Sequence, residues 1–452
     1  MTLLVIDWAG IGIIGIKALQ LILSLSILVT IHELGHYATA KWFKCRVEKF
    51  YLFFDPWFSI WKKKIGDTIY GIGWIPFGGY VKISGMIDES MDKAQMNQPP
   101  KPYEFRSKPA WQRLIIMVAG VIMNVLLALF LFIMITYKWG DDYLPPQNLK
   151  YGLYADTLAQ KIGLQNGDNI ISIDNKPVED ATMIAADIVT NDARSLQVRR
   201  NGQITNIAIP DGFIKELVHS KATGFISIQY PVIVDSVDKK SAKITEGSLL
   251  KNDQIIAFNN HPVQFFWQFE DLKQPYANKI VELKILRGAD TLITKVKLND
   301  KSLVGFQPKN ALKLFGTQHQ TYSFAESIPV GISKCFTMLN KNITGLQQII
   351  TGKVKASESL GSVISIGNLF PSLWDWQAFW SLTALLSIIL AFMNILPIPA
   401  LDGGHALFCI YEIITGRKPS DKFMEYAQMV GMILLLALMA YALGLDIFRM
   451  FK

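Results

Sequence analysis

The sequence predicts a polytopic α-helical membrane protein with four transmembrane helices, a tandem pair of small α+β domains and a membrane-associated β-hairpin. Three observations support this fold class. Half of the 452 residues are hydrophobic and only 18% are charged, which is typical of a membrane protein that carries a soluble part. Four apolar runs are each long enough to cross a bilayer, for which about 20 residues are needed. A segment of domain size also occurs twice along the chain.

The four apolar runs extend over residues 10–36, 113–137, 376–398 and 426–447. The first run is interrupted by Lys17, has no basic region before it and contains no small-x-small cleavage motif. We therefore expect it to remain as a helix and not to be cleaved as a signal peptide. With the motifs at their ends included, the predicted membrane segments are residues 1–43, 113–137, 376–405 and 426–447.

The loops between these segments predict their orientation. Loop 41–112 carries twelve Lys and Arg residues against seven Asp and Glu residues, whereas residues 1–11 carry no basic side chain. Basic loops stay in the cytoplasm, so the segment 44–112 is expected inside and the N-terminus outside. Residues 138–375 then lie outside, the loop 406–425 lies inside, and the C-terminus lies outside.

The net charge of +8 does not indicate nucleic-acid binding. Most of the basic excess lies next to membrane segments, so contact with the lipid bilayer is the expected reason for it, and no nucleic acid is expected as a partner. The three cysteines, Cys45, Cys335 and Cys409, are scattered and form neither a disulfide framework nor a CxxC zinc motif.

The outer region contains a tandem repeat. "IGLQNGDNIISIDNKPV" (162–178) and "GSLLKNDQIIAFNNHPV" (247–263) match at an offset of 85 residues, for example Asp168 with Asp253. The repeat predicts two domains, 144–228 and 229–309, which resemble circularly permuted PDZ domains. PDZ domains bind an extended peptide at a sheet edge, and the candidate peptide-binding residues are Gly224, Phe225, Gly305 and Phe306. The alternative is that both domains are structural spacers.

The stretch "LVTIHELGHYATAKWF" (28–43) places ionisable residues at the end of an apolar helix, which usually marks a functional site. His32 and His36 lie four residues apart and share one helix face, so they are candidate ligands of one zinc ion. Glu33 is the candidate general base. The alternative is a pair of histidines that only satisfy each other in the core.

A catalytic zinc usually has three protein ligands and one open position. The best third candidate is Asp402 in "NILPIPALDGGH" (394–405), because Pro397 and Pro399 must break the helix before it. The first and third membrane segments both run from outside to inside, so the two motifs are expected at the same depth. His405 competes for this role and is expected instead near the ligands or on the cytoplasmic surface.

HExxH is a pattern typical of zinc proteases, and a protease that acted inside a membrane would have to bind an unwound substrate whose backbone groups need partners. The segment 66–85 is predicted to form a β-hairpin that dips into the membrane, with Gly78, Gly79 and Tyr80 as candidate substrate-binding residues. An ordinary cytoplasmic hairpin is the alternative. Asn394 is a further candidate for substrate binding, and a hydrogen bond between helices is its alternative role.

The segment 321–372 is predicted to form amphipathic helices on the membrane surface. Apolar residues recur at spacings of three and four, which gives one apolar stripe on a helix. The stripe consists of Ile328, Ile332, Phe336, Leu339, Ile343, Leu346 and Ile350. Such a stripe either packs in a core or lies on a leaflet and helps to control substrate entry.

The chain resembles the site-2 protease family of intramembrane zinc metalloproteases. The resemblance rests on HELGH, "PFGGYVKISG" (76–85), "FRSKPAWQRLIIMVAGVIMNVLLAL" (105–129), the tandem domains and "NxxPxPxLDGGH", in this order. The order is similar to that of the regulator-of-sigma-E branch of the family. One difference is "AGVIMN" (119–124), where relatives often have Gly-Pro before the Asn. We expect this difference to lie away from the chemistry.

The resemblance implies one zinc ion held by His32, His36 and Asp402, with catalysis by Glu33. It implies single-pass membrane proteins as substrates, such as an anti-sigma factor after a prior extracytoplasmic cut, and remnant signal peptides. The cleavage would serve regulated intramembrane proteolysis in the envelope stress response. The PDZ domains would then exclude uncut substrates by size.

Two other classes of protein remain as alternatives. A membrane adaptor with a structural zinc would normally have four protein ligands, and the sequence offers three and a glutamate. A zinc transporter would need several ionisable residues along its spans, and the second and fourth apolar runs are nearly free of them.

Overall fold

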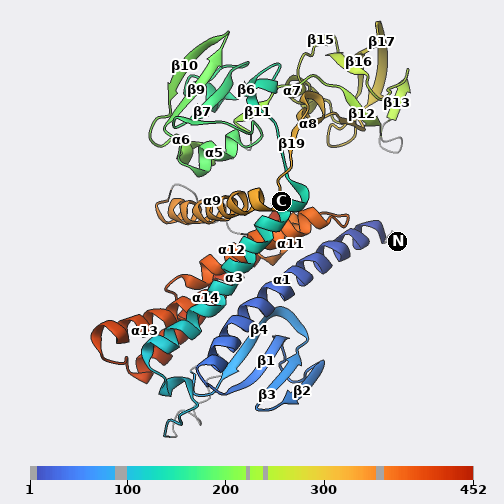
Figure 1. Cartoon of the computed structure of the whole chain (residues 1–452). Helices are drawn as coiled ribbons and strands as arrows, with labels where there is room; N and C mark the ends of the chain where they lie inside the picture. Colours follow the sequence, from blue (N-terminus) through green and yellow to red (C-terminus); the bar gives the residue numbers. More distant parts are fainter. Residues whose placement is uncertain (1–7, 87–98, 220–223, 238–242, 353–360, 451–452) are drawn as a thin grey trace. The chain divides into compact units, whose positions relative to one another are not determined.

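The computed structural model describes residues 8–86, 99–219, 224–237, 243–352 and 361–450. The chain forms two compact units (Figure 1). The helical unit contains residues Met1–Gly140, Thr321–Ile349 and Lys355–Lys452, and the outer unit contains Asp141–Gln320 with Ile350–Val354. The outer unit is therefore inserted into the sequence of the helical unit.

Four helices of the helical unit are long and apolar enough to cross a membrane, which confirms the predicted number of spans. They are α1 (Trp8–Trp42), α3 (Ala110–Trp139), α12 (Trp376–Ile395) and α14 (Asp421–Met450). Helix α3 packs against both α1 and α12. The contact between α1 and α3 is close, because a Cβ added to Gly35 would lie 2.5 Å from the carbonyl oxygen of Ala119.

The third span is followed by a break and a second helix, α13 (Asp402–Thr415). Residues 396–401 between the two helices include Pro397 and Pro399, which cannot continue α12. The segment 406–425, predicted as the loop between the third and fourth spans, is helical in its first part. Ala406 and Cys409 of α13 are buried, and the helix ends only at Gly416, whose left-handed conformation forms a C-cap.

The segment between α1 and α3 forms a four-stranded sheet in the order β2-β3-β1-β4. The strands are β1 (Val47–Phe54), β2 (Trp61–Ile65), β3 (Thr68–Ile72) and β4 (Ile75–Ile83). The predicted hairpin over 66–85 is therefore wrong, because β3 and β4 flank β1 instead of pairing with each other. The prediction omitted β1, whose apolar sequence "VEKFYLFF" competes successfully for both partners.

Helix α9 (Phe324–Ile350) contains the predicted amphipathic stripe. Ile328, Ile332, Phe336, Ile343 and Ile350 are exposed, whereas Leu339 packs beside Ala128 of α3. The buried side of α9 carries small residues that approach α3, and a Cβ added to Gly331 would lie 2.6 Å from Cα of Ile133. A shorter helix, α11 (Val363–Leu369), follows. An apolar face turned outward is the arrangement expected of a helix that contacts lipid.

The outer unit contains two similar halves. The first half has a four-stranded sheet (β10-β9-β7-β8) and a two-stranded one (β11-β6), and the second has a five-stranded sheet (β13-β17-β16-β14-β15) and a two-stranded one (β12-β18). The elements of the first half are β6 (Leu153–Ala155), α4 (Thr157–Lys161), β7 (Asn169–Ile173), β8 (Lys176–Pro177), α5 (Ile184–Thr190), β9 (Ser195–Arg200), β10 (Gln203–Ala208), α6 (Phe213–His219) and β11 (Ile226–Ile228).

The elements of the second half are β12 (Val234–Val237), β13 (Lys243–Glu246), β14 (Gln254–Phe258), β15 (His261–Pro262), α7 (Phe266–Lys273), β16 (Ile280–Arg287), β17 (Asp290–Lys297) and β18 (Phe306–Pro308). Helix α8 (Ala311–Phe315) follows. The described chain also contains short 3-10 helices: η1 (Phe105–Ser107) in the helical unit, and η2 (Pro146–Asn148) and η3 (Gln274–Tyr276) in the outer unit. Each half buries its own hydrophobic core.

The two halves repeat one buried ion pair. In the first half, Nε and Nη2 of Arg200 donate to the two carboxylate oxygens of Asp168 at 2.8 and 2.7 Å. In the second half, Arg287 donates to Asp253 in the same way, at 2.7 Å for both bonds. Both carboxylates are buried. Burial favours the neutral acid at Asp253, but the Arg287 guanidinium and the Leu250 amide hold the pKa of this residue below its ordinary value.

The main segment of the outer unit, Asp141–Gln320, begins and ends at one place. Strand β5 (Asp141–Tyr143) directly follows α3, and β19 (Gln318–Gln320) lies shortly before α9. The two strands pair antiparallel, with Tyr143 opposite Gln318 and Asp141 opposite Gln320. The chain therefore enters and leaves this segment through one two-stranded ribbon.

Candidate metal centre

Helix α1 presents His32 and His36 on one face, one turn apart. The helix is continuous there because residues 16–31, directly before HELGH, contain neither proline nor glycine. Both imidazoles are buried, and their Nε2 atoms lie 3.2 Å apart. Nδ1 of His36 lies 2.8 Å from the carbonyl oxygen of Ile116 on α3. A carbonyl can only accept, so Nδ1 carries the proton and Nε2 is left with a free lone pair.

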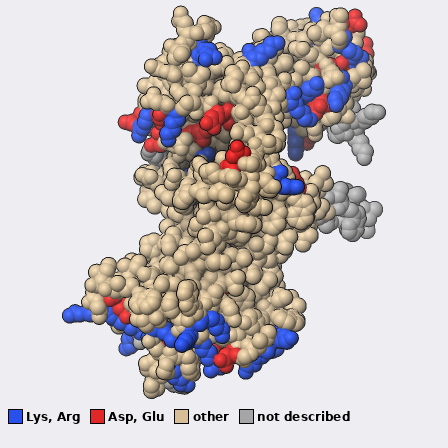
Figure 2. Space-filling view, in the orientation of Figure 1, with Lys and Arg blue, Asp and Glu red and all other residues tan. Residues whose placement is uncertain are grey.

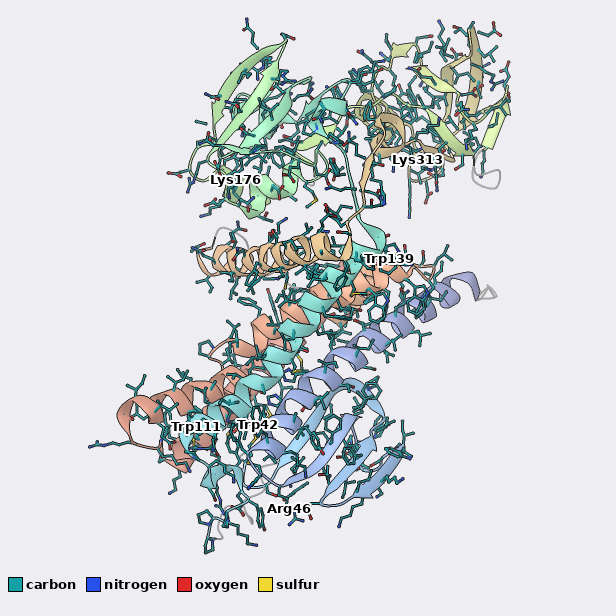
Figure 3. The ribbon with its side chains drawn as sticks, in the orientation of Figure 1. Trp42, Arg46, Trp111, Trp139, Lys176 and Lys313 are labelled. Atoms are coloured by element: carbon teal, nitrogen blue, oxygen red, sulfur yellow. The ribbon has the colours of Figure 1, made fainter. Side chains whose placement is uncertain are left out.

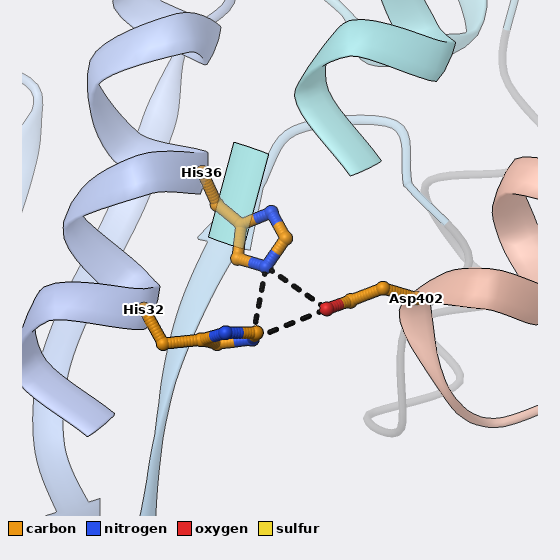
Figure 4. Close-up of side chains that lie close together, drawn as sticks. All are labelled: His32, His36 and Asp402. Carbon is orange, nitrogen blue, oxygen red and sulfur yellow. Dashed lines mark hydrogen bonds and ion pairs between the residues drawn. The ribbon is translucent and has the colours of Figure 1, made fainter. Parts of the chain in front are cut away.

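Asp402 is the first residue of α13 and reaches the same point (Figure 4). Its Oδ2 atom lies 3.2 Å from Nε2 of His32 and 3.5 Å from Nε2 of His36. The two glycines after it allow this close turn, because a Cβ added to Gly403 would lie 2.3 Å from the carbonyl oxygen of Ile395. The structure thus brings Asp402 to two histidines that lie more than 360 residues before it in the sequence.

The geometry of the three atoms fits a zinc ion. Tetrahedral zinc with bonds of about 2.0–2.2 Å holds its ligand atoms about 3.3–3.6 Å apart. The observed separations of 3.2, 3.2 and 3.5 Å agree with this spacing. Among the described residues, the buried Oδ2 of Asp402 has no hydrogen-bond partner beyond these two imidazoles. Two imidazole nitrogens and a carboxylate oxygen that converge in this way form a donor set that suits a cation.

A cavity of about 410 Å³ opens beside the three side chains. Glu33 lines it together with His405, and Glu33 is half-buried. His405 does not belong to the cluster of converging ligand atoms in the described chain. Lys49 and Lys82 also line the cavity, so it contains both carboxylates and ammonium groups. The cavity is large enough for a short stretch of extended peptide beside Glu33.

Two of the four predicted substrate-binding residues, Gly79 and Tyr80, line this cavity. Asn394 does not line it, but its Nδ2 lies 3.4 Å from Nε2 of His32, which does. Gly78 lies against the ring of Phe54. Strand β4, which contains Gly79 and Tyr80, is an edge strand of its sheet, so one side of it has no strand partner in the described chain.

Two of the four predicted peptide-binding residues of the outer unit, Phe225 and Phe306, pack in its two cores. Phe225 is buried, and its ring lies 5.9 Å from the ring of Phe213. Phe306 is half-buried, 5.8 Å from the ring of Phe269. Gly224 and Gly305 precede these rings directly. Their backbone N–H groups are the groups that a peptide carboxylate would need, and peptide binding there stays a prediction.

Comparison with known proteins identifies the family. The model of "Peptidase family M50" matches residues 20–438. The chain belongs to this family. A "Putative zinc metalloprotease" of Treponema pallidum is 28% identical over 92% of this chain and 95% of its own length. The "Regulator of sigma E protease" of Haemophilus influenzae is 25% identical over 95% of this chain and 98% of its own length.

Membership in family M50, the site-2 protease family, confirms the predicted family and makes the chain a metalloprotease. The four long apolar helices make it an integral membrane protein. The family also implies zinc, and the cluster of His32, His36 and Asp402 suits that metal. The chain covers nearly the whole length of these relatives, so the M50 peptidase extends over both units.

The sequence prediction missed two residues of α3 in this M50 peptidase. A Cβ added to Gly120 would lie 2.4 Å from Nε2 of His36 and 2.7 Å from Cε1 of His32, so only glycine leaves room for the imidazoles. Asn124 is fully buried, and its Nδ2 lies 3.2 Å from Nδ1 of His32. The segment "AGVIMN", expected away from the chemistry, therefore contacts the candidate ligands. A buried Asn in the middle of an apolar span was the available signal.

Proposed function

We propose that this M50 peptidase cleaves the transmembrane segments of single-pass membrane proteins and holds one zinc ion through His32, His36 and Asp402. The observation that carries the proposal is the convergence of these three side chains beside Glu33, in a cavity between membrane-spanning elements. When bound, the zinc would polarise the scissile carbonyl and increase the acidity of the attacking water.

In this proposal, Glu33 acts as the general base. Its carboxylate accepts a proton from the attacking water and then donates it to the amine of the leaving peptide. Asn394 donates a hydrogen bond from Nδ2 to the substrate carbonyl. The edge of β4 at Gly79 and Tyr80 pairs with the unwound substrate strand and satisfies its backbone groups, which have no water available inside a bilayer. The Asp402 carboxylate and the two imidazoles remain in place throughout.

The arrangement of aromatic and basic residues supports an orientation with the site near the cytoplasmic face. Trp42 and Trp111 mark one end of the spans and Trp139 marks the other (Figure 3). Lys and Arg gather at the end that carries the sheet, and the visible surface of the spans is almost free of charge (Figure 2). Basic residues favour the cytoplasm. We infer an inner-membrane protein with periplasmic termini and a periplasmic outer unit.

The substrate class follows from the resemblance in sequence and from one relative. The relative in Haemophilus influenzae is named a regulator of sigma E protease. We infer that an anti-sigma factor, already trimmed by an extracytoplasmic cut, is cleaved in an envelope stress response, and that remnant signal peptides are further substrates. The two halves of the outer unit act as PDZ domains that exclude untrimmed substrates.

Glu33→Gln tests the chemistry. The purified protein and the variant are assayed for bound zinc and for cleavage of a single-pass substrate whose outer domain has been removed. We expect zinc in both and cleavage in the unsubstituted protein alone. Equal cleavage by both, or no cleavage by either over a series of substrates, would refute the proposal and favour an adaptor with a structural metal.

A further inference from the structure

Exposed aromatic rings form a cluster at one end of the sheet, called here the aromatic tip and consisting of Trp57, Phe58 and Trp74. Trp57 is 91% exposed, Phe58 57% and Trp74 38%. The ring of Trp74 stacks on both others, at centroid distances of 6.0 Å to Trp57 and 5.7 Å to Phe58. A stacked apolar cluster of this exposure normally marks contact with another apolar phase.

The course of β4 along α1 shows where the aromatic tip lies. Ile83, at the end of β4, packs in one core with Ala40 and Cys45 near the end of α1. Gly79 lies against Val29, about three turns earlier in α1. The strand therefore runs beside the span, and its first residue, Ile75, lies about 13 Å beyond Gly79. Trp74 directly precedes this residue, so the aromatic tip lies at the end of β4 that is farther from Ala40 and Cys45.

Strand β2 forms the edge of the sheet beside the tip and carries three consecutive lysines, Lys62, Lys63 and Lys64. All are exposed, and none forms an ion pair with an acidic side chain of the described chain. The register places Lys64 opposite Ile69, which lies opposite Lys49 of β1. The lysines therefore extend from the tip toward the end of the span marked by Trp42, which is 79% exposed.

We propose that β2 and the aromatic tip bind anionic phospholipids of the leaflet at the basic end of the spans. The rings lie among the acyl chains, and the three ammonium groups reach along their aliphatic stems to headgroup phosphates. Charge complementarity selects this partner, because three neighbouring lysines without an ion pair in the described part of the chain repel one another unless anions lie between them. Lysines on an edge strand also prevent aggregation, but that role does not account for exposed rings beside them.

The lipid preference is tested on the full-length protein in nanodiscs of phosphatidylcholine mixed with phosphatidylglycerol. The lipids that stay bound after transfer to detergent are measured by native mass spectrometry. The variant combines Lys62→Gln, Lys63→Gln and Lys64→Gln. The control combines Lys176→Gln, Lys251→Gln and Lys297→Gln, three exposed lysines of the outer unit that give the same change in charge.

We expect the β2 variant to retain at least about threefold less phosphatidylglycerol than the control, which matches the unsubstituted protein. Equal retention in both variants would overturn the proposal. A second result would also overturn it: the unsubstituted protein retains an added acidic peptide through these lysines but shows no preference for phosphatidylglycerol. The partner would then be a protein segment. Neither lipid retention nor peptide retention depends on proteolysis, so this lipid-binding proposal and the proposed function can fail independently of each other.

The depth of the aromatic tip is tested by labelling. The three native cysteines are buried, so a fluorophore attached after Trp57→Cys or Phe58→Cys reports on the tip. Ile204→Cys, an exposed position in the outer unit, is the control. We expect lipids with brominated acyl chains to quench both tip labels and not the control. Unquenched labels at both tip positions would overturn the proposal.

Discussion

At the scale of single residues, the candidate metal centre depends on side chains that carry no ligand atom. His36 is oriented by the carbonyl of Ile116, and His32 by Asn124. Partners of this kind fix the tautomer and the direction of a ligand. The Asn124 amide can serve His32 in both tautomers, because its NH₂ group donates to an unprotonated Nδ1 and its oxygen accepts from a protonated one. Metal binding through Nε2 requires the second arrangement.

Replacement of Asn124 by Leu is expected to lower the affinity for zinc about 10-fold to 100-fold, because His32 loses the acceptor that holds the proton on Nδ1. Asn124→Asp retains an acceptor and is expected to retain most of the affinity. Zinc content during titration with a chelator measures both variants. Equal zinc loss from the Leu and Asp variants would show that Asn124 acts through packing alone.

A methyl group at Gly120 is expected to disturb both imidazoles, since it would lie 2.4 Å from Nε2 of His36. Gly120→Ala should lose bound zinc and cleavage together. Gly15→Ala on α1 is the matched control, because an added Cβ there has no atom within 4 Å. Metal analysis of the two purified variants decides the matter, and full zinc in Gly120→Ala would contradict the close contact.

At the scale of secondary-structure elements, the sequence predicted the spans well and the sheet poorly. Long apolar runs determine a membrane helix locally, because each backbone group bonds within its own segment. Strand pairing depends on competition between segments. The segment "VEKFYLFF" forms β1 and lies between β3 and β4, whereas the predicted hairpin required β3 and β4 to pair directly. His32, His36 and Asp402 were recognisable from motif spacing, whereas Gly120 and Asn124 matter only through contacts made in three dimensions.

The repeated ion pair predicts how the second half of the outer unit responds to change. Arg287→Met leaves the buried Asp253 carboxylate unpaired and should lower the free energy of unfolding of this half by about 1–3 kcal/mol. Arg199→Met, at an exposed position on β9, should have almost no effect. Calorimetry of the full-length protein compares the two variants, and equal unfolding temperatures would contradict the importance of the pair.

The pH dependence of this half follows from the lowered pKa of Asp253. A carboxylate whose pKa is lower in the folded state stabilises the fold above its unfolded pKa of about 3.9, and this stability is lost as the pH falls through the folded value. The contribution is therefore complete at neutral pH. Unfolding of the second half, followed at decreasing pH, should be less acid-sensitive in Asp253→Asn than in the unsubstituted protein.

At the scale of the whole molecule, the outer unit is an insertion that begins and ends at the β5–β19 ribbon. Neighbouring strands lie about 4.8 Å apart. Replacement of residues 144–317 by a short Gly-Ser turn between Tyr143 and Gln318 is therefore expected to leave the helical unit folded, with its zinc content unchanged. If the outer unit excludes substrates by size, the shortened protein should also cleave untrimmed substrates faster. Metal analysis and a cleavage assay test the two statements separately.

The division of the candidate ligands between α1 and α13 has a mechanical consequence. Two ligands belong to one span, and the third belongs to a helix that follows the break after another span. A bound ion would therefore act as a cross-link between the first span and the helix that follows the third span. Its binding free energy adds to the energy needed to separate them. Chelation would then loosen the wall of the cavity as well as end catalysis, and a bound metal would limit how widely the two helices could separate.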